Sequence, residues 1–314
     1  MIAMDFKFTE KNGINEPEEK KDEELKVVFP GCYEDIPENR EIVIPEGIEE
    51  IAENTFMNFE HLESIKLPRS MKVISHSAFS GCKKLKNVEM QHGLEEIRDE
   101  AFSSCPGLIS IVIPDTVTRI GEGAFEACAN LAKIKLSESL LMIGAGAFAY
   151  CFNLVDVTIP DSCILIEFNA FASCFSLEAI KLSDNMGLID ECLFEGCRSL
   201  KIVDLPSKLT KIGRRAFKGC SSLASIILPI TVRTIGYDAF AGCSSLSRIA
   251  IPRDIADIED EDIFNSCDSL TDVSFGGSRE RWEMLNRGKT LTVERSDCSL
   301  HTPRVTFLDI KDKT

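Results

Sequence analysis

Phenylalanine returns every 23 residues along most of this 314-residue chain, and this period limits the possible fold more than any other feature. An isoleucine column from Ile51 to Ile258 and a leucine column from Leu62 to Leu270 run in register with it. Self-similarity at a fixed short period predicts an array of stacked structural repeats. The phenylalanine column is Phe56, Phe79, Phe102, Phe125, Phe148, Phe171, Phe194, Phe217, Phe240 and, after one inserted residue, Phe264.

The apolar spacing changes within each repeat, and each spacing predicts a local structure. Ile134 and Leu136 alternate at period two, which predicts a short strand with one buried face. A proline such as Pro114 usually follows this strand and ends its ladder, because proline has no N–H and a fixed φ. Phe125 and Cys128 then follow at three-residue steps, which predict a single helical or 3₁₀ turn.

One such coil cannot bury its apolar side alone, so the coils must stack. Parallel pairing of successive strands at about 4.8 Å would give ten coils a length of roughly 48 Å. We expect residues 26–31 and the strand at 42–44 to start the stack, and the segment with the single tryptophan, Trp282, to close it. Truncating one rung, as in Phe148→Ala, should cost about 3–5 kcal/mol, because the neighbouring rungs cannot fill the void.

The repeat, read as I-P-x-x-V-x-x-I-G-x-x-A-F-x-x-C-x-x-L-x-x-I-x-I, closely resembles the BspA-like class of leucine-rich repeats. The resemblance implies a mostly β leucine-rich repeat solenoid of about ten right-handed 23-residue coils, with a parallel sheet and short helical or 3₁₀ turns. It divides the chain into an acidic leader and N-terminal cap (1–41), ten repeats (42–275) and a C-terminal cap (276–314). Departures from the pattern are expected to bend local turns only: Gln91, Ser137, Ser183, Cys163 and Leu193.

The charge balance argues against two classes of partner. The net charge is −16 and the isoelectric point is about 4.8, which disfavours polyphosphates and anionic lipid surfaces. The N-terminal sequence has neither the basic start nor the apolar stretch of a signal peptide. We therefore expect no nucleic acid partner and no membrane insertion, and the cytoplasm as the compartment.

Nine of the thirteen cysteines form a column of the repeat, and the sequence predicts reduced, buried thiols for them. Replacing Cys151 with serine should therefore destabilise the fold by burying an unpaired hydroxyl. Cys163 occupies an apolar column, whereas Cys192 aligns with polar residues and is expected to be exposed and to be the most reactive thiol. The column is Cys82, Cys105, Cys128, Cys151, Cys174, Cys197, Cys220, Cys243 and Cys267.

The sequence favours no enzyme, metal or cofactor. It contains no C-x-x-C, H-x-x-x-H, P-loop or G-x-S-x-G pattern, and its glycine pairs fall at coil corners. The four histidines, His61, His76, His92 and His301, are interpreted as ordinary surface residues.

The outward positions of the predicted strands carry the main functional hypothesis. These positions include apolar Val112, Ile202 and Ile227, where solvent would favour polar groups. Strand propensity alone is the competing explanation, because Ile and Val suit any pleated surface. The predicted partner-binding residues are Lys133, Lys135, Lys181, Ile202, Ile227 and Arg248.

The sequence thus predicts a non-enzymatic, monomeric scaffold that binds a protein or peptide through its strand face. The alternative is a secreted or cell-surface adhesin or structural array, with the corresponding location if a targeting segment was removed. An enzyme is the least favoured of the three classes.

Overall fold

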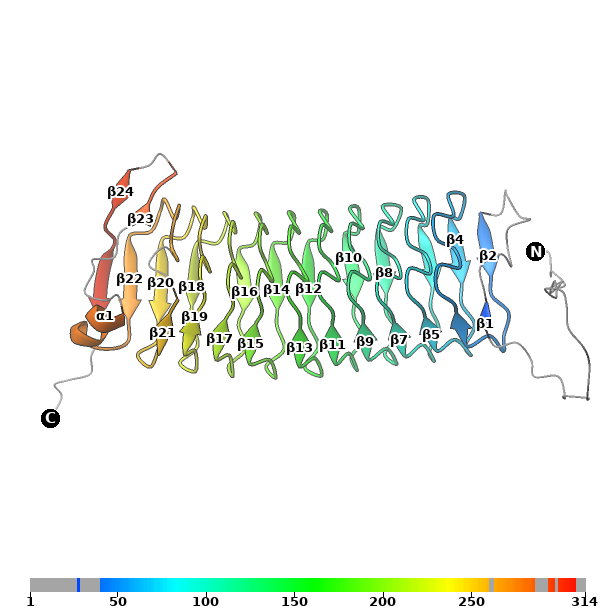
Figure 1. Cartoon of the computed structure of the whole chain (residues 1–314), viewed down its shortest axis with the longest axis horizontal. Helices are drawn as coiled ribbons and strands as arrows, with labels where there is room; N and C mark the ends of the chain where they lie inside the picture. The colour runs from blue at the N-terminus through cyan, green and yellow to red at the C-terminus, as the bar shows by residue number, and fades with distance from the viewer. Residues whose placement is uncertain (1–26, 29–39, 260–262, 286–292, 297–298, 309–314) are drawn as a thin grey trace, which may run out of the picture.

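The chain is a straight solenoid in which successive coils stack along one axis (Figure 1). It was analysed as a computed structural model that describes residues 27–28, 40–259, 263–285, 293–296 and 299–308. Each coil takes about 23 residues, because strand partners such as Ile42 and Ile65 are that far apart. The predicted solenoid of about ten stacked coils with parallel strands is confirmed.

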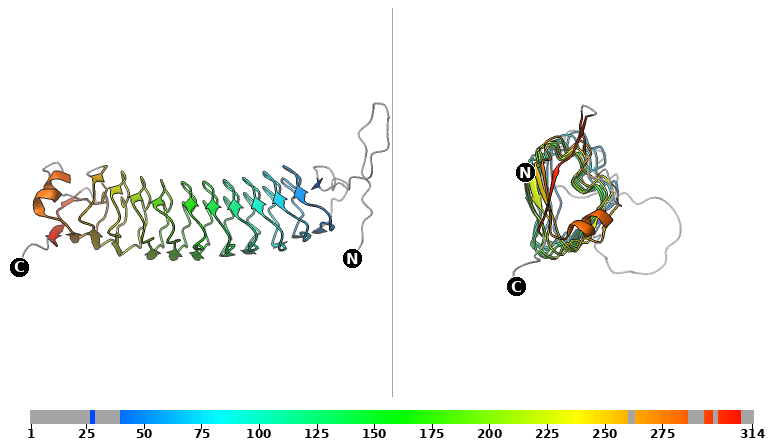
Figure 2. Two further views of the ribbon diagram at one scale, coloured as in Figure 1. Left: turned by 90° about the horizontal axis from the view of Figure 1, so that it is seen from below. Right: turned by 90° about the vertical axis from the view of Figure 1, so that its left-hand side faces the viewer.

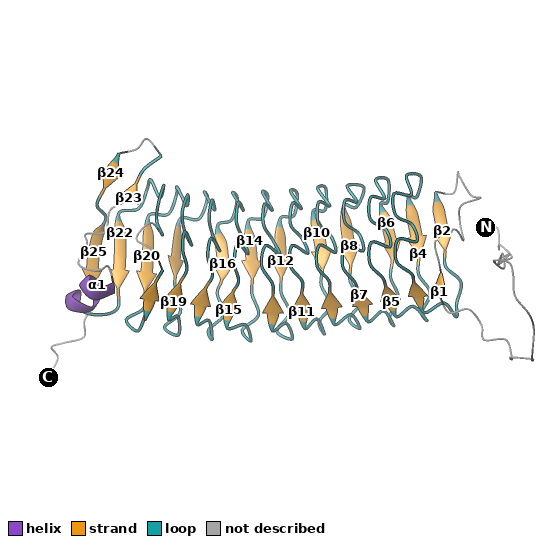
Figure 3. Cartoon of the chain, viewed as in Figure 1, coloured by secondary structure: helices purple, strands orange, loops and turns teal. Residues whose placement is uncertain are grey.

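One strand per coil has a central residue that faces the core and two flanking residues that face solvent. These strands pair in parallel in the sets β2-β4-β6, β8-β10, β12-β14-β16 and β18-β20-β22-β25 (Figure 3). We call the outer surface of this row the strand face. The row comprises β2 (Glu41–Val43), β4 (Ser64–Lys66), β6 (Asn87–Glu89), β8 (Ser110–Val112), β10 (Lys133–Lys135), β12 (Asp156–Thr158), β14 (Ala179–Lys181), β16 (Ile202–Asp204), β18 (Ser225–Ile227), β20 (Arg248–Ile251), β22 (Asp272–Phe275) and β25 (Arg304–Phe307).

The coils also form a second row of strands, each two residues long, which the sequence analysis did not predict. In the regular coils each of these strands ends at the isoleucine that recurs every 23 residues. Val117 and Ile120 both point inward, and the two residues between them face solvent, so burial here does not alternate from residue to residue. A strand of only two residues is too short to show the alternation by which a strand is recognised in a sequence. We call the outer surface of this row the short-strand face. The row comprises β1 (Val27–Val28), β3 (Glu50–Ile51), β5 (Val73–Ile74), β7 (Glu96–Ile97), β9 (Arg119–Ile120), β11 (Met142–Ile143), β13 (Leu165–Ile166), β15 (Leu188–Ile189), β17 (Lys211–Ile212), β19 (Thr234–Ile235) and β21 (Asp257–Ile258).

Both ends of the stack are covered by elements outside the regular repeats (Figure 2). At the N-terminal end β1 pairs in parallel with β3. At the other end β25 extends the strand row, and helix α1 (Arg279–Leu285) brings Trp282 to 5.2 Å from the Phe275 ring, measured between centroids. The antiparallel pair β23 (Val293–Glu294) and β24 (Leu300–His301) lies at the same end.

The predicted helical or 3₁₀ turns are isolated hydrogen-bonded turns. Among the described residues, α1 is the only helix. In each of the first nine coils this turn has two residues in the left-handed region, as in Asn169 (φ 58°) and Ser173 (φ 60°). A residue in the left-handed conformation cannot continue a right-handed helix, so no helix longer than a single turn forms there.

The phenylalanine column forms a continuous stack inside the solenoid. Ring centroids of successive coils lie 5.0 Å apart for Phe79 and Phe102 and 5.4 Å apart for Phe125 and Phe148, with nearly parallel planes. The Phe125 carbonyl accepts the N–H of Cys128 in its own coil and the thiol of Cys151 in the next, both at 3.2 Å. A serine at 151 would therefore find this acceptor, so the expectation of an unpaired hydroxyl is wrong.

Coil spacing widens where the buried alanine that precedes phenylalanine is replaced by a larger residue. Leu193 and Ile263 occupy this column, and the adjacent ring pairs Phe171–Phe194 and Phe240–Phe264 have centroids 6.1 and 6.0 Å apart. The extra buried volume separates the neighbouring coils. At the first of these junctions the short-strand row also loses its pairing, between β13 and β15.

Two of the positions that lack proline keep the turn by a different interaction. Ser137 and Ser183 are fully buried, and their hydroxyls accept the backbone N–H of Ser139 and Asn185, each at 3.1 Å. Such a side-chain turn replaces the constraint that proline supplies elsewhere. The architecture is unchanged at these two coils.

Close coil contact generates a stability prediction at Gly144. A Cβ added there would lie 2.6 Å from the backbone nitrogen of Glu122 in the preceding coil, whereas a Cβ at Gly187 would meet nothing within 4 Å. Gly144→Ala should therefore lower the free energy of unfolding by about 1–3 kcal/mol, as overpacking does. Urea unfolding of the two alanine variants measures the difference. Gly187→Ala should stay within about 0.5 kcal/mol of the parent chain, and equal losses would contradict the stated contact.

Candidate functional site

The strand face presents all six predicted partner-binding side chains to solvent. The central residue of each strand is directed inward, so its two neighbours must point outward. Ile202 on β16 and Ile227 on β18 are 60% and 79% exposed, and the four basic residues are exposed as well. Their predicted outward orientation is thus confirmed, while their binding role stays a prediction.

Strand register divides these six residues into three neighbouring groups. Lys133 and Lys135 lie on β10 beside Ser110 and Val112 of β8. Ile202 pairs with Ala179, which places it diagonally opposite Lys181 across β14 and β16. Ile227 and Arg248 lie on the paired strands β18 and β20. β16 and β18 are not paired with each other, so the two isoleucines belong to separate segments of the strand row.

The basic residues of this set keep their charges available. None of the four forms an ion pair with a described residue, in contrast to Lys66, whose ammonium lies 2.7 Å from the Glu89 carboxylate on the same face. An unpaired exposed cation can orient an acidic partner and raise its association rate.

A shallow groove of about 700 Å³ lies on the turn side of the middle coils, and the sequence analysis did not predict it. Small residues such as Gly146, Ala149 and Ala172 form its floor. Tyr150 and Phe168 border it and are 46% and 49% exposed. The sequence shows the aromatic residues at turn positions that differ from repeat to repeat. It does not show the hollow, which forms because small residues of successive coils lie next to one another.

Acidic side chains gather at the N-terminal end of this groove. Burial raises the pKa of Glu126, and the neighbouring carboxylates of Glu100 and Glu122 raise it further. At the other end of the groove Arg198 lies over the Phe175 ring, 4.7 Å from its centroid. The groove is therefore acidic at its N-terminal end, whereas Arg198 and Arg215 lie with Glu195 at the other end.

The raised pKa of Glu126 generates a pH prediction. Its folded-state pKa exceeds the unfolded value, so its contribution favours the folded state at low pH and is lost as pH rises through the folded pKa. Glu126→Gln should therefore raise the melting temperature at neutral pH and have little effect near pH 4. Differential scanning calorimetry across this range checks the sign, and a loss of stability at neutral pH would contradict it.

Cys192 corrects the sequence-based assignment of an exposed, reactive thiol. The residue is 8% exposed, and its φ of 55° places it in the left-handed column of the turn. Burial and a hydrogen bond with Glu195 raise the pKa of its thiol to about 12. The polar residues at the equivalent position of the other repeats were misleading, because two of them, Ser77 and Asp238, are buried as well.

The column cysteines and Cys163 are also buried and unpaired, as predicted. Burial raises the pKa of Cys128 and of Cys197 to about 12. Reactivity follows the thiolate, so these thiols should be inert near neutral pH. Cys32 and Cys298 lie outside the described residues.

Thiol titration tests this inertness. In a Cys32→Ser/Cys298→Ser background, a thiol reagent at pH 8 should react with none of the remaining cysteines quickly in the native protein and with all of them after denaturation. Reactivity should increase as pH approaches the thiol pKa values. A single fast thiol that disappears in Cys192→Ser would restore the sequence-based assignment.

The histidines occupy separate places in the fold. His61 and His92 are exposed, His76 lies 3.2 Å from the Ser77 hydroxyl, and Nε2 of His301 lies 2.9 Å from the Leu270 carbonyl oxygen. Among the described residues, no three His, Cys, Asp or Glu side chains are arranged to hold a metal ion. Within that same part of the chain, no helix is long and apolar enough to cross a bilayer.

Stacked parallel coils, with a leucine, a phenylalanine and a cysteine column in each, define a leucine-rich repeat solenoid. A family model for the BspA type leucine-rich repeat region matches residues 49–175 and 164–283. The chain therefore belongs to the BspA-type leucine-rich repeat family. The resemblance seen in the sequence is confirmed.

Several solved structures are similar to this chain. A leucine-rich repeat protein from Bacteroides ovatus is 26% identical over 90% of this chain and 86% of its own, with a TM-score of 0.46. A leucine-rich repeat protein from T. pallidum is 32% identical over 59% of this chain and 78% of its own, with a TM-score of 0.45. A leucine-rich cell surface protein from Faecalibacterium prausnitzii is 25% identical over 79% and 90%, with a TM-score of 0.42. No curated protein matches the chain.

Proposed function

We propose that this protein is a non-enzymatic scaffold that binds another protein or a peptide through its strand face. The observation that carries the proposal is the exposure of Ile202 and Ile227, at 60% and 79%, on a rigid parallel sheet. Large apolar side chains held out from a rigid surface are typical anchors of protein interfaces. The leucine-rich repeat fold supports the same class of function.

The neighbouring cations define the kind of partner. Lys181 and Arg248 lie on strands next to those of Ile202 and Ile227, and Lys133 and Lys135 lie further along the same face; none of the four forms an ion pair with a described residue. An acidic partner segment with one or two apolar side chains would complement this arrangement. Because the sheet is already ordered by stacking, little conformational entropy would be lost on the scaffold side.

The compartment is part of the same proposal. The buried cysteines of the described region are unpaired, which supports a reducing compartment such as the cytoplasm. A cell-surface adhesin remains the competing function, and the location of the protein in fractionated cells separates the two.

Affinity capture from a native lysate, followed by mass spectrometry, tests the strand face. Ile202→Asp and Ile227→Asp should each reduce the captured partner at least about tenfold, as anchor residues do, with melting temperatures nearly unchanged. Val43→Asp is the matched control, because Val43 is 66% exposed at the distant end of the same face. Glu126→Lys adds a charge change on the turn side. Equal losses from all four variants, or unfolding of the anchor variants, would refute the assigned site.

A further inference from the structure

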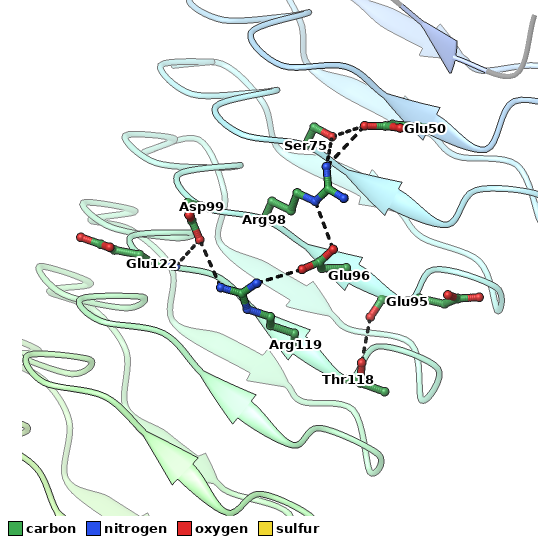
Figure 4. A network of polar contacts seen from close by, with 9 residues as sticks. All are labelled: Glu50, Ser75, Glu95, Glu96, Arg98, Asp99, Thr118, Arg119 and Glu122. Carbon is green, nitrogen blue, oxygen red and sulfur yellow. Dashed lines mark hydrogen bonds and ion pairs between the residues drawn. The ribbon is translucent and has the colours of Figure 1, made fainter.

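The short-strand face changes character along the solenoid. Each coil presents two adjacent outward side chains there, directly before the buried isoleucine. In the N-terminal coils most of these are charged and form ion pairs: the Glu96 carboxylate lies 3.1 Å from the Arg119 guanidinium of the next coil and 3.1 Å from that of Arg98, which follows the buried Ile97 (Figure 4). This part of the face is already neutralised within the chain.

Three successive coils in the middle of the array replace these charges with apolar side chains. The outward pairs are Leu141–Met142, Ile164–Leu165 and Gly187–Leu188, followed by the polar pair Thr210–Lys211. Leu141, Ile164 and Leu165 are 48%, 62% and 36% exposed. We call Leu141, Met142, Ile164, Leu165 and Leu188 the middle patch. The backbone does not require these residues, because other coils place Glu, Arg, Lys and Thr at the same positions.

The arrangement of pairs around β13 is nearly palindromic. Thr118–Arg119 precedes the three apolar pairs and Thr210–Lys211 follows them, so the outward residues have similar character in both directions. In a two-fold contact, residue i meets residue j of the second copy and j meets i, so the apolar pairs at equal distances from β13 would face each other. We propose that two copies of this chain dimerise through their short-strand faces, antiparallel, about a two-fold axis that runs along β13.

This arrangement brings the apolar residues of the two copies opposite one another, and Ile164, which is 62% exposed, faces Ile164 of the second copy. Leu165 faces Leu165 of the second copy, and Met142 faces Leu188 of the second copy. Leu141 lies over Gly187 of the second copy, where the space above the Cα is open. A large residue thus lies opposite a small one.

Charged residues further out select the antiparallel direction. Glu95 and Arg233 lie three coils from β13 on opposite sides, at 69 residues before and after Ile164, so each faces the other in the second copy. Both side chains are exposed, and Glu95 is held 3.0 Å from the Lys72 ammonium in its own chain. The like-charged contact of Arg119 with Lys211 is offset, because Arg119 is paired with Glu96 and lies 3.9 Å from Asp99.

The size of the contact sets its strength. An antiparallel overlap centred on β13 extends from β5 to β21, which is nine coils. At about 4.8 Å per coil the overlap is about 43 Å long, and a width of about 10 Å gives roughly 430 Å² per copy. A total near 900 Å² lies at the low end of specific interfaces, so the dimer should be reversible and form at roughly micromolar concentrations. The predicted monomer is then the dilute state.

Sedimentation velocity of the full chain, from about 1 to about 200 µM, tests this dimer. The parent chain should shift from a species of 34.8 kDa towards twice that mass. Leu165→Asp should abolish the shift, because two carboxylates would meet at the axis. Ile227→Asp, on the strand face, should leave it unchanged, which separates this dimer from the proposed partner site.

A charge swap tests the register. Glu95→Arg and Arg233→Glu should each weaken dimerisation by roughly tenfold, since each breaks two equivalent pairs and creates repulsion. The double variant should recover the parent affinity. The swap also keeps the test decisive if Leu165→Asp fails to fold.

Three results would overturn the proposal: a parent chain that stays monomeric at the highest concentration, an unaffected Leu165→Asp variant that is folded, or a double swap that does not recover. A chain that stays monomeric but binds a different protein through the middle patch would assign this face to a heterologous partner instead.

Discussion

Every feature of this protein depends on hydrogen bonds between the backbones of successive coils, which hold each coil at one spacing above the last. Phe125 illustrates the coupling, since its N–H donates to the Ala147 carbonyl of the next coil at 2.8 Å, and its own carbonyl accepts the Cys151 thiol of that coil. The aromatic stack and the cysteine column follow from this repeat distance. Residues 23 positions apart therefore become neighbours, and any property of the surface is built from such columns.

The sequence predicted the interior well and the surface unevenly, for a physical reason. Phe148 and Ile143 recur at a fixed period because each must contact its copies in the coils above and below, so their burial could be inferred directly. Strand-face exposure of Ile202 also followed from simple alternation. Sequence register is sufficient wherever stacking alone decides the environment of a side chain.

Prediction failed where side-chain direction depends on local backbone conformation or on several coils at once. Cys192 was misassigned because its small side chain stays 8% exposed beside Glu195, whereas longer residues of the same column, such as Arg215, reach solvent. The groove beside Phe168 depends on small residues in neighbouring coils, such as Ala149 and Ala172. The middle patch was missed because it lies on strands of two residues, which carry no periodic signal.

The junction at Leu193 has a mechanical consequence. A solenoid whose units contact only their neighbours transmits load as elements in series, and its compliance is concentrated at the most weakly joined pair. Wider ring separation and the missing β13–β15 pairing weaken the contact between these two coils. Torsion applied to the ends would therefore concentrate at this junction and at those where the strand row is interrupted, so the rod would twist at a few discrete joints instead of evenly along its length.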